Sequence, residues 1–118
     1  MEPIKIVEKV WGREEWLVND DYCVKKLYIN KGCKLGLHYH EKKDELFYII
    51  SGRVLLNHGS DIQHLEELVL KLGDSIRITP NTLHTIVAFE DSLILESSTH
   101  HEDSDSYRIP GQESRKVF

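Results

Sequence analysis

We expect an all-β fold, a sandwich or barrel of antiparallel strands, from three observations on this sequence of 118 residues. Short runs rich in β-branched and aromatic residues recur about every ten residues, with Gly, Asn, Asp or Pro between them. No run carries a convincing helical stripe of apolar residues. The apolar content of 40% supports one core but not two, so the chain is expected to form a single domain over residues 1–118.

Clusters of turn-forming residues mark the ends of the expected strands. Gly, Asn and Asp tolerate a positive φ and Pro presets a bend, so such clusters interrupt a strand. They lie at Asn30-Lys31-Gly32, Ser51-Gly52, His58-Gly59-Ser60-Asp61, Leu72-Gly73-Asp74 and Thr79-Pro80-Asn81. The expected strands are, in chain order, Ile4–Val10, Glu15–Val18, Tyr22–Asn30, Lys34–Tyr39, Glu45–Ser51, Arg53–Asn57, Glu67–Lys71, Ser75–Ile78, Leu83–Phe89 and Leu93–Ser98.

Two segments need separate comment. Within His64–Leu72 the leucines would share one helical face, but Gly73 and the β-branched neighbours favour a strand. The segment His100–Ser106 is acidic and rich in Ser, which is typical of a loop. We therefore expect a barrel over roughly residues 7–98 and a tail over roughly residues 99–118, whose end, Gln112–Phe118, is mobile or packs on a neighbour.

The charge and the apolar runs exclude several classes of partner. A formal net charge of -5 argues against nonspecific nucleic-acid binding, which needs clustered Lys and Arg. The longest apolar run, Leu46–Ile50, is far shorter than the roughly 20 residues of a membrane-spanning helix. Residues Met1–Lys9 lack the order of a signal peptide, so we expect a cytoplasmic protein. In that compartment Cys23 and Cys33 are expected to be free thiols, with a single disulfide as the alternative.

A metal site is the strongest functional signal of the sequence. His38 and His40 alternate on an expected strand, so both side chains project from the same face. A short turn would bring Glu45 alongside them on the next strand, and His84 follows a second turn far downstream. Imidazoles with a carboxylate suit zinc, iron, manganese or nickel. A metal-free pocket lined by the same residues is the alternative.

These residues resemble the cupin superfamily of small jelly-roll β-barrels, also described as double-stranded β-helices. The first cupin motif, G-x5-H-x-H-x3,4-E-x6-G, is matched in full by Gly32, His38, His40, Glu45 and Gly52. The second motif is matched in part by Gly73-Asp74, Pro80 and His84, with Thr79, Asn81 and Ala88 as departures. Asparagine tolerates a positive φ, so Asn81 can replace the usual glycine.

A narrower resemblance is to the cupin domain of type II mannose-6-phosphate isomerases, the bacterial enzymes fused to mannose-1-phosphate guanylyltransferases. It rests on Val10-Trp11-Gly12, Val24-Lys25-Lys26-Leu27, Leu35–Gly52 and Tyr107-Arg108-Ile109. The chain departs from that family at two positions. His38 stands where the family has glutamine, and Thr85 stands where an arginine commonly follows the last ligand.

The resemblance implies a function and a ligand set. His38, His40, Glu45 and His84 would bind one divalent transition metal ion, and the protein would act on a sugar or sugar phosphate as an isomerase or epimerase. Two alternatives remain open: an iron, manganese or nickel oxygenase, and a noncatalytic module that binds a small ligand. By analogy with single-domain cupins we also expect a homodimer, for which Trp11 and Trp16 offer apolar surface unless they pack within the monomer.

The roles of the remaining polar side chains are less determined. Lys25 shares strand parity with core residues and is the candidate catalytic base, with a lysine reaching to the barrel rim as the alternative. Tyr39 should point away from the metal because it lies between two ligands. The resemblance implies that Arg108 helps to fold the tail back on the barrel. Four other histidines are expected to be solvated or in loops: His58, His64, His100 and His101.

Overall fold

The computed structural model describes residues 2–118, which form β-strands and one short 3-10 helix. The elements are β1 (Lys5–Lys9), β2 (Gly12–Asn19), β3 (Tyr22–Ile29), β4 (Cys33–Lys34), β5 (His38–Tyr39), β6 (Glu45–Ser51), β7 (Arg53–Gly59), β8 (Glu66–Lys71), β9 (Ser75–Ile78), β10 (Leu83–Ala88), β11 (Ser92–Thr99), η1 (Asp103–Asp105), β12 (Tyr107–Arg108) and β13 (Arg115–Lys116). The expected all-β fold is confirmed.

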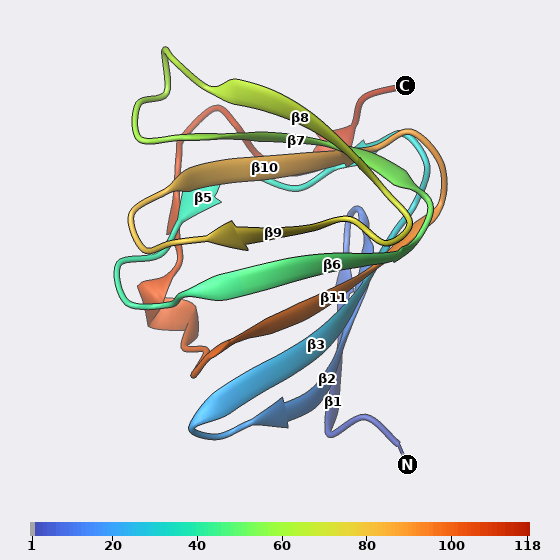
Figure 1. Ribbon diagram of the computed structural model, residues 1–118, viewed down its shortest axis with the longest axis vertical. Coiled ribbons are helices and arrows are strands. Elements are labelled where there is room, and N and C mark those ends of the chain that lie inside the picture. The colour runs from blue at the N-terminus through green and yellow to red at the C-terminus, as the bar shows by residue number, and fades with distance from the viewer. Residues whose placement is uncertain (1) are drawn as a thin grey trace.

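The strands form two antiparallel sheets that face each other around a common interior (Figure 1). The first sheet has the order β1-β2-β3-β11-β6-β9. The second has the order β12-β5-β10-β4-β13, and β7 pairs with both β10 and β8. Neighbours in a sheet are often distant in sequence, as β3 and β11 are, which is typical of a jelly roll.

Side chains of alternate residues from both sheets fill the interior. Along β3 every second residue is buried, so Cys23, Lys25, Leu27 and Ile29 share the inner face. The predicted inward direction of Lys25 is therefore confirmed. The apolar core joins both sheets through Leu27, Ile29, Phe47, Ile49 and Ile94 of the first and Val54, Leu56, Ile86 and Ala88 of the second.

The two glycines of the first cupin motif both need a positive φ. Gly32 has φ 80° and Gly52 has φ 91°, values that side chains with a Cβ rarely adopt. A Cβ at Gly52 would also lie 2.1 Å from the Oγ of Ser92 on β11. The motif glycines are therefore explained by the turns that flank the ligand-bearing strands.

One predicted strand is interrupted. The segment expected as a single strand, Lys34–Tyr39, forms the separate strands β4 and β5. Between them the backbone N–H of Leu35 donates to Ile86 on β10, at 2.9 Å, whereas that of Leu37 donates to Gln112 of the C-terminal segment, also at 2.9 Å. The chain thus changes partner within three residues, which a local pattern does not reveal.

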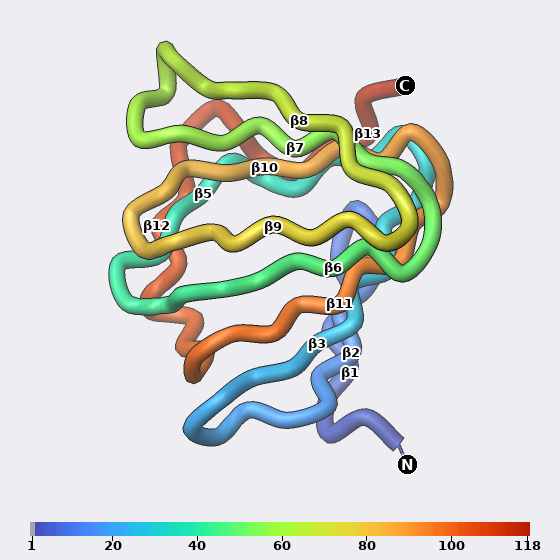
Figure 2. The backbone as a smooth tube through the Cα atoms, viewed as in Figure 1, coloured from blue at the N-terminus to red at the C-terminus, as the bar shows by residue number. Residues whose placement is uncertain are grey.

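The C-terminal segment packs on its own barrel (Figure 2). Strand β12 pairs with β5, and β13 pairs with β4. The expectation that Gln112–Phe118 is mobile or packs on a neighbour is therefore wrong for the described chain, since this segment closes the second sheet. Arg108 lies on β12 and its side chain is exposed, so the role expected for it in folding the tail back stays a prediction.

Several other expectations are decided by burial. Trp11 and Trp16 are buried, with exposed fractions of 4% and 8%, so they pack within the monomer and supply no dimer surface. Cys23 and Cys33 are buried free thiols, as expected. His58 lies on β7 and not in the loop predicted for it. Among residues 2–118, no helix has the length and apolar character to cross a bilayer.

Candidate metal centre

The second sheet and the start of β6 bring the four predicted donors together. His38 on β5 lies directly opposite His84 on β10 in the strand register. His40 follows β5, and Glu45 is the first residue of β6. The backbone N–H of Asn81 donates to the carbonyl of His40 at 2.6 Å, and Asn81 has φ 66°. The prediction that Asn81 takes the place of the usual glycine is therefore confirmed. Its hydrogen bond to His40 links the second cupin motif to the first.

The three imidazoles form a compact cluster. One ligand atom from each of His38, His40 and His84 lies within 4.8 Å of the others. The Oε2 atom of Glu45 lies 3.3 Å from the Nε2 atom of His40 and 3.2 Å from that of His84. Two donors about 2.1 Å from one ion are about 3.0 Å apart at a right angle and about 3.4 Å apart at a tetrahedral angle. The observed separations of Glu45 from the two histidines lie within this range.

Backbone carbonyls orient all three imidazoles in the same way. The Nδ1 atoms of His38, His40 and His84 lie 2.8, 3.0 and 2.9 Å from the carbonyl oxygens of Gly36, Asp105 and Thr82. A carbonyl only accepts a hydrogen bond, so each Nδ1 carries the hydrogen and donates. In a neutral ring each Nε2 atom then keeps its lone pair. This is the arrangement in which histidines bind metals.

The contact between His84 and Glu45 is the clearest sign of a missing partner. The Nε2 atom of His84 and the Oε2 atom of Glu45 are buried and make no hydrogen bond to any described residue. With the hydrogen on Nδ1, both atoms are acceptors, and two buried acceptors at 3.2 Å need a proton or a cation between them. The donor set therefore fits a metal ion.

The electrostatics of the cluster suit the same set of donors. Burial, reinforced by the neighbouring His84, lowers the pKa of His38 to about 3. Burial also lowers the pKa of His40 below its usual value. For Glu45 burial alone would raise the pKa, but His84, Lys43 and His40 outweigh it and lower the pKa to about 2. At neutral pH His38 and His40 thus offer neutral imidazoles, and Glu45 offers an ionised carboxylate.

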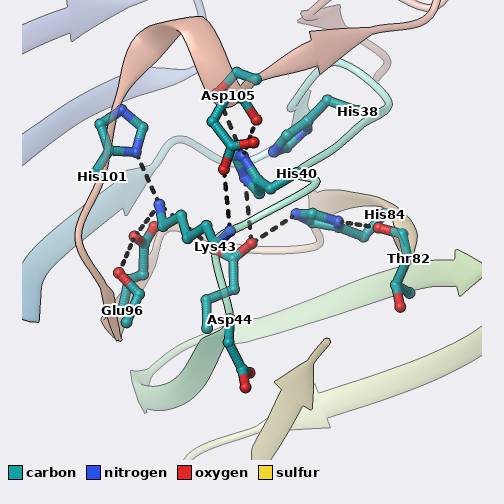
Figure 3. A network of polar contacts seen from close by, with 12 residues as sticks. His38, His40, Lys43, Asp44, Thr82, His84, Glu96, His101 and Asp105 are labelled. Atoms are coloured by element: carbon teal, nitrogen blue, oxygen red, sulfur yellow. Dashed lines mark hydrogen bonds and ion pairs between the residues drawn. The ribbon is translucent and has the colours of Figure 1, made fainter. Parts of the chain in front are cut away.

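A buried polar network that the sequence analysis missed adjoins the donors (Figure 3). The Nζ atom of Lys43 lies 2.5 Å from the Oε2 atom of Glu96, 3.0 Å from the Nδ1 atom of His101 and 3.9 Å from the Oε1 atom of Glu45. Lys43 and Glu96 are buried. The expectation that His101 is solvated is wrong, because its side chain is 9% exposed and packs edge-on against Trp16.

The pKa values in this network follow from burial and from the lysines. Burial, together with Lys43 and Lys25, lowers the pKa of His101 to about 4. Burial raises the pKa of Glu96 despite the nearby Lys43. Glu96 could have been found from the sequence, because it shares strand parity with Ile94, a core residue. Lys43 lies in a turn, where no periodicity indicates a direction.

Asp105 holds the turn that connects the donors. Its carboxylate accepts hydrogen bonds from the backbone N–H groups of Glu41, Lys42 and Lys43 at 3.0, 3.2 and 3.0 Å. Its backbone carbonyl is the partner of the His40 ring. Burial alone would raise the pKa of Asp105, but these N–H groups lower it. The C-terminal segment therefore positions the turn between His40 and Glu45.

The donors open into a polar cavity of about 420 Å³ between the two sheets. His38, His40 and Glu45 line it together with Lys25 and Arg108. The base role predicted for Lys25 stays a prediction. Tyr39 is absent from the cavity lining and stacks on Tyr107, with ring centroids 5.1 Å apart, in agreement with its expected direction away from the donors.

Comparisons with known proteins agree with this geometry. Residues 26–96 match the cupin domain family. The uncharacterized protein YdbB of Bacillus subtilis (strain 168) is 35% identical over 65 residues, which cover 55% of this chain and 52% of YdbB. The chain thus spans only about half the length of this relative.

Three solved structures share the fold. KdgF from Halomonas sp. has a TM-score of 0.69 at 22% identity, covering 78% of this chain and 81% of KdgF. A single-residue variant of the oxalate decarboxylase of Bacillus subtilis has a TM-score of 0.78 at 16% identity, covering 89% of this chain and 30% of that chain. The capsular polysaccharide assembling protein CapF of Staphylococcus aureus has a TM-score of 0.81 at 18% identity, covering 92% of this chain and 33% of that chain. At such identities the likeness concerns the fold alone. The match over residues 26–96 shows that the chain belongs to the cupin family.

Proposed function

We propose that the protein binds one divalent transition metal ion, zinc, manganese, iron or nickel, through His38, His40, Glu45 and His84. The observation that carries this proposal is the buried contact at 3.2 Å between two acceptor atoms, Nε2 of His84 and Oε2 of Glu45. The fixed tautomers of the three histidines support it, because each Nδ1 is already occupied by a carbonyl.

We further propose that the protein acts on a small carbohydrate, a sugar or sugar phosphate, as an isomerase or epimerase similar to mannose-6-phosphate isomerases. The motif resemblance and the polar cavity beside the donors support this reaction. The fold is shared with CapF, a capsular polysaccharide assembling protein, which is an analogy of fold alone. When bound, the ion supplies positive charge that polarises a carbonyl or hydroxyl oxygen of the sugar.

The chain itself must supply the group that moves the proton between adjacent carbons. Lys25 faces the cavity, but its Nζ atom contacts a carboxylate and an aromatic ring, both of which are partners of an ammonium cation. Glu96 also lines the cavity, and burial raises its pKa. We therefore propose Glu96 in place of Lys25 as the base: its carboxylate exchanges protons with the sugar while Lys43 holds it in place.

Metal content tests the donor set. We expect protein purified without added ions to contain about one equivalent of metal, and we expect His40→Ala to lose it. His64→Ala is the matched control, because the side chain of His64 is 79% exposed and lies outside the cavity. Unchanged metal content in His40→Ala would refute the donor assignment.

Turnover tests the reaction. The metal-loaded protein is expected to convert mannose 6-phosphate or a related hexose phosphate, and Glu96→Gln is expected to lower kcat with little effect on metal content. Absence of turnover across a panel of sugar phosphates would rule out this reaction. Tight binding of a sugar in a thermal-shift measurement without any turnover would indicate a noncatalytic binding module.

A second candidate is a metal-dependent oxygenase. His38 favours it, because a set of three histidines and one glutamate suits iron or manganese in oxidative cupins, whereas the isomerases that the chain resembles have glutamine at this position. Oxygen consumption by the ferrous protein with a small organic acid, thiol or diketone would distinguish this function from isomerisation.

We also propose that the protein forms a homodimer. Ile4, Ile6 and Val10 are exposed at and beside β1, with exposed fractions of 64%, 54% and 72%, and β1 pairs within residues 2–118 with β2 alone. A second copy would cover these apolar side chains. Light scattering should give twice the mass of 13.8 kDa, and Ile6→Lys should reduce it to that of the monomer.

We place the protein in the cytoplasm. The free thiols of Cys23 and Cys33 suit a reducing compartment. Cell fractionation followed by immunoblotting would test this location, and recovery of the protein in a secreted fraction would contradict it.

A further inference from the structure

Two lysines flank one tryptophan at the end of the cavity formed by β1, β2 and β3. In the strand register Lys5 lies opposite Trp16, and Trp16 lies opposite Lys25. The Nζ atoms of Lys5 and Lys25 lie 4.6 and 4.0 Å from the centroid of the Trp16 ring. All three side chains line the cavity.

The ammonium of Lys25 is buried with few partners. Its side chain is 2% exposed, and among residues 2–118 its hydrogen-bond acceptor is the Oε1 atom of Glu14, at 3.4 Å. That distance is long for a bond between charged groups, and the same oxygen accepts a bond of 2.9 Å from the Nε1 atom of Trp16. An ammonium has three donors, so the hydrogen-bonding capacity of Lys25 is largely unused.

The charges around Lys25 do not balance. The Nζ atom of Lys9 lies 4.0 Å from the Oε2 atom of Glu14, so this carboxylate serves both Lys9 and Lys25. Lys5 also lines the cavity, and no carboxylate of the described chain lies within 4.0 Å of its Nζ atom, but Asp103 lines the same cavity and its pKa is lowered by His101 and, more weakly, by Lys5 and Lys25. Three lysines, Lys5, Lys9 and Lys25, thus face two carboxylates, those of Glu14 and Asp103, and the remaining positive charge at this end of the cavity attracts an anion.

We propose that this end of the cavity is a binding site for an anionic group, a phosphate or a carboxylate, with Lys25 as its anchor. The site is called the anion pocket here and comprises Lys5, Lys9, Trp16 and Lys25. Incoming anionic oxygens complete the hydrogen bonds of Lys25, while Lys5 and Lys9 add charge at its entrance. The proposal deepens the proposed carbohydrate function and rests on it for the identity of the substrate.

The position of the anion pocket restricts the shape of the substrate. Lys25 on β3 and Glu45 on β6 are separated by β11 in the sheet, which places their strands about 10 Å apart. A substrate that reaches both the donors and the anion pocket must be elongated, with its charged group remote from the oxygens held at the donors. A hexose phosphate or a hexuronate has this shape, and a compact dianion such as oxalate does not.

Calorimetric titration of metal-free protein with inorganic phosphate tests the anion pocket. Lys25→Met is expected to weaken phosphate binding about tenfold or more, because a hydrogen bond to a charged group is lost. Lys26→Met is the matched control, since Lys26 lies next in the chain, is not part of the cavity lining and pairs with Glu15 at 3.7 Å. Its phosphate affinity should stay within about twofold of the wild type.

Further measurements make the outcome independent of folding and of the metal. If Lys25→Met does not fold, Lys9→Met at the partly exposed entrance is expected to weaken binding severalfold. Titration of the wild type with mannose 6-phosphate, glucuronate and mannose separates phosphate from carboxylate recognition, and neutral mannose should bind weakest. Wild-type protein that binds neither anion, or equal phosphate affinity in Lys25→Met, would overturn the proposal. Phosphate binding by the wild type, together with no turnover of any sugar phosphate by the metal-loaded wild type, would support the anion pocket while refuting the isomerase function.

Discussion

At the scale of single residues, the pair formed by Lys43 and Glu96 has the largest energetic consequence. Both side chains are buried, and their charged atoms lie 2.5 Å apart. Removing the charge of Glu96 leaves Lys43 in the interior with only the more distant carboxylate of Glu45, 3.9 Å away, which costs about 3 kcal/mol. We therefore expect Glu96→Gln to lower the free energy of unfolding by about 3 kcal/mol in urea denaturation.

A double variant separates the charge from the packing. In Lys43→Met/Glu96→Leu no buried charge remains at this position, so part of the lost stability should return relative to Glu96→Gln. A loss below about 1 kcal/mol in Glu96→Gln would mean that Glu45 or water compensates Lys43, or that Glu96 already carries a proton in the wild type.

Also at the residue scale, the pKa of Glu14 predicts how the free energy of unfolding depends on pH. Burial alone would raise the pKa of Glu14, but Lys25, Trp16 and Lys9 lower it overall. A carboxyl whose folded pKa lies below its unfolded value of about 4.3 adds stability above that value and loses it as the pH falls through the folded pKa.

Urea midpoints measured from neutral pH down to about pH 3 provide the test. The difference in stability between the wild type and Glu14→Gln should be constant at neutral pH and shrink below about pH 4.3. Curves that stay parallel throughout this range would show that the pKa of Glu14 does not change on folding.

At the scale of elements, the turn between β5 and β6 is ordered by a residue distant in sequence. The carboxylate of Asp105 accepts hydrogen bonds from the backbone N–H groups of Glu41 and Lys43, both at 3.0 Å. The backbone carbonyl of Asp105 also orients the His40 ring. Asp105→Ala should therefore loosen two of the proposed metal donors, His40 and Glu45, without removing either. Loss of such supporting contacts typically lowers metal affinity 10- to 100-fold, roughly the effect expected here.

Competition with a coloured chelator measures this change. Glu102→Ala is a suitable control, because the side chain of Glu102 is 56% exposed and contacts the solvent-facing His100. Equal metal affinity in Asp105→Ala and the wild type would show that the turn keeps its geometry without the carboxylate.

The limits of the sequence-based prediction are also set at the level of elements. The sequence predicted that four polar side chains meet, because strand alternation and short turns fix the directions of these side chains locally. They belong to His38, His40, Glu45 and His84. Lys43 could not, since its direction depends on His101, 58 positions away, and on Glu96 across the sheet. The C-terminal strands were missed for a similar reason, because β12 and β13 have two residues each and form only against β5 and β4.

At the scale of the whole molecule, the C-terminal segment completes the sheet that carries the histidines. The backbone N–H of Gly36 donates to the Oγ atom of Ser114 at 2.9 Å, and that of Leu37 donates to the carbonyl of Gln112 at 2.9 Å. The carbonyl of Gly36 in turn orients the His38 ring. The last third of the chain is thus coupled, through Gly36 and Leu37, to His38, one of the four proposed metal donors.

Removal of residues 110–118 is expected to affect both stability and metal binding. The N–H groups of Gly36 and Leu37 would lose their partners, each at a cost of about 1–3 kcal/mol if it remains buried. His38 would lose the fixed position of the carbonyl that orients it, so metal affinity should fall together with the melting temperature. Ser114→Ala, which removes only the bond to Gly36, should lower the melting temperature less and leave the metal stoichiometry unchanged. A truncated protein with wild-type metal affinity would show that β5 and β10 alone hold the donors in place.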